Sequence, residues 1–90
     1  MLKFKATKQF DKDIKRIIKR KLDLSLLDEV VRTLLEEKPL APRHRDHPLK
    51  GNYAGFRECH IAPDWLLIYA VYEENLILVA ARTGSHSDLF

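Results

Sequence analysis

The first residues of the chain alternate between apolar and basic side chains. Leu2, Phe4 and Ala6 are separated by Lys3 and Lys5. A repeat of two residues is typical of a β-strand that buries one of its faces. The pattern therefore predicts a short strand at the start of the fold, with its lysines directed to solvent.

Two segments with a helical repeat follow. The first begins after Thr7, a residue type that caps helices, and extends to about Lys21, with apolar side chains at Phe10, Ile14, Ile17 and Ile18. The second begins at Asp23 or Ser25 and ends before Pro39, with an apolar stripe of Leu24, Leu27, Val31, Leu34 and Leu35. The short connection between them favours an antiparallel helical hairpin.

A proline-containing basic run and three β-type segments complete the chain. Residues 38–48 hold three prolines, which favours an ordered loop. Three later segments, 56–61, 65–72 and 76–82, have the composition of strands. The two short separators favour an antiparallel meander. The order β-α-α-β-β-β thus predicts an α+β domain in which a two-helix hairpin packs on a twisted, mostly antiparallel sheet.

The length of the chain limits what it can fold into. Its 90 residues, 46% of them hydrophobic, suffice for one core and are too few for a second folded unit. We therefore expect residues 1–90 to form a single domain. The single cysteine, Cys59, cannot form an internal disulfide, which favours a reducing compartment such as the cytoplasm. No apolar stretch approaches the roughly 20 residues of a membrane-spanning helix, so no membrane partner is expected.

Charge is distributed unevenly along the chain. Residues 1–21 contain nine lysines and arginines against two aspartates, which gives +7 in a chain whose net charge is +3. On the first predicted helix, Lys12, Lys15 and Lys19 lie among the polar positions. A basic surface can attract a polyanion such as nucleic acid or an acidic protein. The alternative is a solvated helix face, which the charge pattern alone favours.

Five polar residues lie near the ends of the predicted strands, namely His47, His60, Asp64, Arg82 and His86. Strand ends of a meander can converge on one site. Imidazole and guanidinium groups together can cleave RNA without a metal: a base removes the ribose 2′-OH proton, an acid protonates the leaving 5′-oxygen, and a guanidinium neutralises the phosphorane. A zinc site is the weaker alternative, because the close ligand spacings of metal sites are absent.

Four further residues have roles that the sequence leaves less defined. Trp65 begins a core strand and can pack there or stack on an RNA base, and Phe90 can pack back onto the domain or meet a ligand. Cys59 and the histidine after it point to opposite faces of a strand, so we expect a buried structural cysteine. His44 lies in the basic run 43–45, where a solvated loop is expected.

Three segments resemble a known family: DHPLKG at 46–51, FRECHIAPDWLLIY at 56–69 and RTGSHSDLF at 82–90. They look like motifs of the YafQ branch of the RelE superfamily, which are bacterial type II toxins. The resemblance extends over essentially the whole chain. It implies a RelE-like fold and a ribosome-associated endoribonuclease that cleaves mRNA without a metal or other cofactor. It also implies a cognate antitoxin protein as partner and a free toxin that is monomeric.

The resemblance also implies the site residues. The matching positions are His47, His60, Asp64, Trp65, Arg82, His86 and Phe90. In such toxins the histidines and the aspartate share proton transfer, the arginine faces the phosphate, and the aromatic residues bind the substrate. Of the imidazoles, His86 is our choice for the acid. For Lys12, Lys15 and Lys19 the resemblance adds contacts to ribosomal RNA.

Two other functions are open at this point. A protein of the same fold can inhibit a macromolecular target such as DNA gyrase without catalysis, as the ParE branch does. A second alternative is a module that binds RNA or the ribosome and leaves phosphodiesters uncut. The histidine set argues against a pure inhibitor, which has no need of several imidazoles near one arginine.

Overall fold

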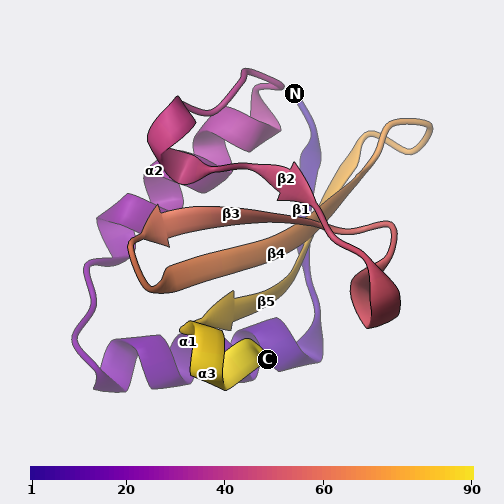
Figure 1. The fold of residues 1–90 in the computed structure, drawn as a ribbon. Coiled ribbons are helices and arrows are strands. Elements are labelled where there is room, and N and C mark those ends of the chain that lie inside the picture. Colours follow the sequence, from indigo (N-terminus) through magenta and orange to yellow (C-terminus); the bar gives the residue numbers. More distant parts are fainter.

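The computed structural model covers residues 1–90 and has one sheet, with the two longer helices on one face and the short C-terminal helix on the other (Figure 1). Its elements in chain order are β1 (Lys3–Ala6), α1 (Lys8–Lys19), α2 (Leu24–Leu35), η1 (Pro42–His44), β2 (His47–Pro48), η2 (Gly51–Tyr53), β3 (Arg57–Ala62), β4 (Trp65–Tyr72), β5 (Ile77–Gly84) and α3 (His86–Leu89). The five strands lie in the order β1-β5-β4-β3-β2. All neighbours are antiparallel except β1 and β5, which are parallel. The expected α+β class is confirmed.

Helices α1 and α2 begin at the caps that the sequence predicts. The Thr7 hydroxyl accepts from the Phe10 amide at 3.0 Å, and the Asp23 carboxylate accepts from the Ser25 amide at 2.9 Å. These side chains satisfy amide groups that have no partner within a helix. The apolar stripes of both helices then pack on the sheet in a cluster of 13 buried residues that includes Ile17, Leu34 and Leu67. This is the main core.

The other face of the sheet carries a smaller apolar cluster. Its buried members are Leu66, Ile68, Ala81 and Leu89, and Leu49, Tyr53 and Phe56 pack against them. Side chains alternate between faces along β4, so Leu66 and Ile68 lie opposite to Leu67. We call this second side the open face, because α1 and α2 do not cover it (Figure 1).

Some local expectations were wrong. Ile18 is 54% exposed although it belongs to the predicted apolar stripe of the first helix, and the same helix buries the charged Asp13 completely, at 0% exposure. All four residues of β1 are exposed, Phe4 at 44%, because this edge strand pairs with β5 alone. Only Leu2, which precedes the strand, is buried. The short elements β2 and α3 were not predicted. No helix is long and apolar enough to span a bilayer.

Candidate active site

Strand register brings two of the predicted site residues, His47 and Arg82, onto the open face. His47 of β2 lies opposite Glu58 of β3, Glu58 lies opposite Ile68, and Ile68 lies opposite Arg82 of β5. Residues in register across neighbouring strands project from the same face. Since Ile68 belongs to the cluster on the open face, this row extends from His47 to Arg82 across that side of the sheet.

A second row brings two more histidines together. His60 lies opposite Leu66, and Leu66 lies opposite Gly84, two residues before His86. The rings of His60 and His86 have centroids 5.8 Å apart. Two imidazoles from opposite ends of the meander therefore share one small area, as the sequence predicts.

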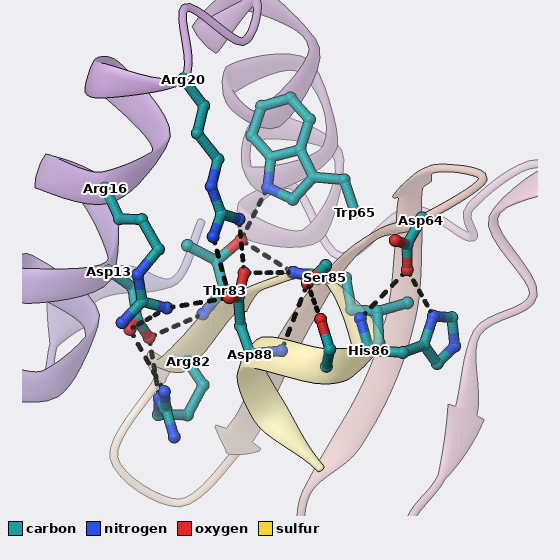
Figure 2. Close-up of polar contacts among 12 residues, drawn as sticks. Asp13, Arg16, Arg20, Asp64, Trp65, Arg82, Thr83, Ser85, His86 and Asp88 are labelled. Carbon is teal, nitrogen blue, oxygen red and sulfur yellow. Dashed lines mark hydrogen bonds and ion pairs between the residues drawn. The ribbon is translucent and has the colours of Figure 1, made fainter.

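Asp64 orients the His86 ring (Figure 2). One oxygen of its carboxylate lies 2.7 Å from His86 Nδ1 and accepts the His86 backbone amide at 3.0 Å. The hydrogen bonds from the His86 amide and ring lower the pKa of Asp64 below its ordinary value. A carboxylate that holds Nδ1 fixes the ring and leaves Nε2 for a reacting group. This arrangement suits a proton-transferring histidine.

Glu58 is a component that our sequence reasoning missed. Its side chain is almost buried, and one carboxylate oxygen lies 3.2 Å from His47 Nε2 and 4.0 Å from His60 Nε2. His47 Nδ1 lies 2.6 Å from the Arg45 carbonyl, which can only accept, so this ring nitrogen donates. A signal was present in the sequence, because Glu58 is two residues from His60 in a predicted strand and must share its face.

Arg82 is held by a buried carboxylate on α1 (Figure 2). Its Nε and Nη2 donate to the two oxygens of Asp13 at 2.8 and 3.2 Å, and the Thr83 amide donates to the same carboxylate at 3.1 Å. The hydrogen bonds that Arg82 donates to Asp13 raise the pKa of Arg82. The paired guanidinium keeps a fixed orientation, and Nη1 takes no part in this pairing. Asp13 is a second component that the sequence reasoning missed.

An ion-pair network joins α1 to α3, the helix that carries His86 (Figure 2). Arg20 donates to both oxygens of Asp88 at 2.6 and 3.0 Å, and Arg16 lies 3.6 Å from the same carboxylate. Asp88 also accepts the Ser85 amide at 2.9 Å, while the Ser85 hydroxyl caps α3 in return. The Arg20 hydrogen bonds hold the pKa of Asp88 well below its ordinary value. This network fixes the short C-terminal helix.

Trp65 packs in the core, which is one of the two roles that the sequence left open for it. Its side chain is 3% exposed and lies in the core beneath the helices. The indole N–H donates to the Thr83 hydroxyl at 2.9 Å, and that hydroxyl donates to the Leu66 carbonyl at 2.7 Å. A buried ring with a satisfied N–H is typical of a packing residue, which supports the packing alternative over base stacking. Phe90, by contrast, is 64% exposed and meets the Tyr53 ring edge to face at 5.8 Å.

The structure also gives the surroundings of the basic residues on α1, of the single cysteine and of the histidine in the basic run. Lys12, Lys15 and Lys19 are exposed on α1 and form no ion pair, as both interpretations of the basic helix require. Cys59 is completely buried, and burial raises the pKa of its thiol to about 12, which confirms a structural cysteine. The solvated-loop interpretation of His44 was wrong, since its Nδ1 donates to the His60 carbonyl at 2.6 Å. No group of three or more His, Cys, Asp or Glu side chains is arranged to hold a metal ion.

Known proteins resemble the chain over its full length. A family model described as the bacterial toxin YafQ of type II toxin-antitoxin systems matches residues 2–90. The mRNA interferase toxin YafQ of Escherichia coli K12 is 39% identical over 83 residues, or 91% of this chain and 88% of the relative. A metal-bound toxin from Helicobacter pylori is 50% identical, with a TM-score of 0.94 and 100% of both chains covered. A chain of the E. coli DinJ-YafQ complex is 35% identical, with a TM-score of 0.90, covering 100% of this chain and 99% of that one.

The fold and these similarities define the class of the protein. It is a bacterial toxin of the type II toxin-antitoxin systems. Within that class, the chain belongs to the YafQ family. The family resemblance expected from the three motifs is thereby confirmed.

Proposed function

We propose that the protein is an endoribonuclease that cleaves mRNA by attack of a ribose 2′-OH on the adjacent phosphate. The E. coli relative that shares 39% of its residues over 83 positions is named an mRNA interferase. The observation that carries the proposal is the pair of imidazoles, His60 and His86, whose centroids are 5.8 Å apart, with Asp64 holding one of them. Two imidazoles at this separation can reach the two sides of one phosphodiester.

His86 acts as the acid in this proposal. Asp64 holds its Nδ1, so Nε2 delivers the proton to the 5′-oxygen as the P–O5′ bond breaks. His60, with Glu58 and His47 behind it, takes the 2′-OH proton as the 2′-oxygen bonds to phosphorus. The products are a 2′,3′-cyclic phosphate and a free 5′-hydroxyl. Imidazole suits both steps, because its ordinary pKa of about 6.5 lies near neutral pH.

Arg82 stabilises the charge that builds up on the phosphorane. Asp13 binds Nε and Nη2 and so presents the remaining guanidinium nitrogen from a fixed position. A preorganised cation stabilises developing charge without having to reorient during the reaction. Phe90, exposed beside Tyr53, offers a ring on which a neighbouring base can stack.

We further propose that the toxin acts on mRNA at the ribosome in the cytoplasm, as a monomer until an antitoxin binds it. Lys12, Lys15 and Lys19 are exposed and without carboxylate partners, which makes them available to phosphates of ribosomal RNA. A cognate antitoxin is supported by the E. coli DinJ-YafQ complex, a chain of which is 35% identical to this one. Charge reversal at the three lysines should weaken pelleting with ribosomes and leave the fold intact.

Growth and mRNA ends after induction test the proposed chemistry. We expect the wild type to stop growth and to produce new mRNA 5′ ends, whereas His86→Ala and Arg82→Ala should lose cleavage by about 10² to 10⁴. Circular dichroism of each purified variant establishes that it folds. Equal toxicity and equal cleavage by all three proteins would refute the catalytic assignment.

A further inference from the structure

A second cleft adjoins the candidate active site and shares His60 with it. The cleft encloses about 510 Å³ and is lined by the basic run 43–45 and by residues 60–63 at the end of β3. This volume lies within the range of about 300–1,000 Å³ that is common for small-ligand sites. Because the His60 ring also lies 5.8 Å from that of His86, the cleft is adjacent to the pair of histidines proposed to act on the scissile phosphate.

Two arginines of the cleft have charges that no carboxylate compensates. Each of the other arginines lies within ion-pair distance of a carboxylate: Arg16, Arg20, Arg32, Arg57 and Arg82. Arg43 and Arg45 are exposed and form no ion pair. Asp46, next to them in sequence, is bound by Arg57 at 3.2 Å and by the Tyr69 hydroxyl at 2.5 Å. The cleft therefore presents two free guanidinium groups beside an imidazole.

The basic run is fixed to the sheet. The His44 ring donates to the His60 carbonyl at 2.6 Å. Arg45 has a left-handed backbone, with φ at +46°, and its amide donates to the Pro42 carbonyl at 3.1 Å. Residues other than glycine rarely adopt this conformation, and here it ends the η1 turn. The guanidinium groups thus extend from a backbone that is anchored beside His60.

We propose that this cleft is a second RNA subsite, in which Arg43 and Arg45 bind the phosphate of a nucleotide next to the scissile bond. The inference rests on the proposed function and adds a defined place for the substrate strand. Planar guanidinium groups bind phosphate oxygens in a bidentate manner, which favours arginine at such a position. A backbone phosphate carries no base identity, so the subsite sets the register of the strand and its affinity without selecting a sequence.

Short RNA probes can test the subsite. The His86→Ala protein keeps the probes intact, and its affinity is measured by fluorescence anisotropy for a dinucleotide with one phosphate and for trinucleotides extended at the 5′ or 3′ side. We expect one extension to tighten binding by about tenfold, as expected for one charge-assisted contact. Adding Arg43→Gln and Arg45→Gln should abolish this gain and reduce the log-log salt slope by about 0.7 for the lost phosphate.

Lys3→Gln in the same His86→Ala protein is the matched control. Lys3 is an exposed cation on β1, at the opposite edge of the sheet from the cleft, and its removal should leave the gain in place. The subsite is refuted if the arginine variants keep the full gain or if neither extension tightens binding. If the wild-type toxin still cleaves mRNA in that case, only the subsite is refuted and the proposed function stands. If the wild-type toxin leaves mRNA intact, the proposed function itself is refuted.

Discussion

The two faces of the sheet differ in the size of their apolar clusters and in the polar residues that they carry. The cluster between the sheet and the helices α1 and α2 has 13 buried residues, none of them a histidine, whereas the open face has a cluster of only four together with the polar row from His47 to Arg82. Burial of apolar area supplies most of the stabilising free energy of a small domain. Stability therefore comes mainly from the side covered by α1 and α2, the covered face, and the open face is where we propose that substrate chemistry takes place.

Asp13 connects the two faces. Asp13 lies on α1, on the covered side of the sheet. Its carboxylate accepts hydrogen bonds from the Thr83 amide and from Arg82, whose side chain projects from the open face. Thr83 in turn accepts from the indole of Trp65 in the core. A substitution at Asp13 should affect both stability and activity because Asp13 holds Arg82, whereas one at His86 should affect activity alone.

The largest loss of stability is expected at Trp65. Trp65→Ala should reduce the free energy of unfolding by about 3–5 kcal/mol, because it leaves a cavity in the covered face. Trp65→Phe keeps most of the ring but removes the donor to Thr83, so it should destabilise the fold less and leave cleavage per folded molecule nearly unchanged. Urea unfolding and cleavage assays test both variants. If the Trp65→Phe protein has normal stability and reduced activity, Trp65 contributes to substrate binding and not only to packing.

Asp13→Ala is expected to have the next largest effect, on the order of 3 kcal/mol, because it leaves Arg82 and the Thr83 amide without their shared acceptor. Cleavage should fall as well, since the guanidinium loses its orientation. Asp13→Asn keeps an acceptor oxygen and should recover part of the stability. If Asp13→Ala loses stability while its rate per folded molecule stays at the wild-type level, Asp13 does not position Arg82.

Gly84→Ala should have a smaller effect on stability and a clear effect on activity. A Cβ at this position would lie 2.9 Å from Asp88 Oδ2 and 3.0 Å from Asp88 Cβ, so α3 must shift to admit it. We expect a cost of about 1–3 kcal/mol, as for overpacking, and a lower kcat, because α3 carries His86. Ser87→Ala, an exposed change on α3, serves as the control. Unchanged kcat in Gly84→Ala would mean that the position of α3 is not critical.

The smallest effect is expected from the charge of Asp88, and it depends on pH. A carboxyl whose pKa is lowered in the folded state stabilises the fold above its ordinary pKa of about 3.9 and loses that contribution as the pH falls toward the lowered value. The melting temperatures of wild type and Asp88→Asn should therefore differ by a constant amount near neutral pH and converge below about pH 4. A difference that persists unchanged in acid would show that the carboxylate charge is not what stabilises α3.

Local sequence patterns predicted much of the fold. The caps at Thr7 and Asp23, the helical stripes and the three long strands depend on residues close together in sequence, and the structure has them nearly where the pattern indicates. Of the residues in the resembling motifs, His60 and His86 lie close together, as predicted, whereas Trp65 packs in the core under the helices. The convergence of strand ends in a meander was sufficient to anticipate the proximity of the two histidines.

The supports of the site were not predictable in the same way. Arg20 and Asp88 are 68 positions apart, and Asp13 and Arg82 are 69 apart, so no local repeat relates them. The register that sets Arg82 opposite Ile68 is followed by an irregularity between Ile68 and Tyr69, which residue spacing alone does not reveal. Burial of Asp13 also contradicts the usual preference of a carboxylate for solvent, and only the partner from β5 explains it.

The ion pairs between α1 and the C-terminal residues have a practical consequence. A chain divided between α2 and β2 would give one fragment with Asp13 and Arg20 and another with every histidine of the proposed site. Neither fragment alone would hold an ordered guanidinium beside a fixed imidazole. Co-expression of such halves would place toxicity under the control of whatever brings them together, which is the requirement for a complementation reporter.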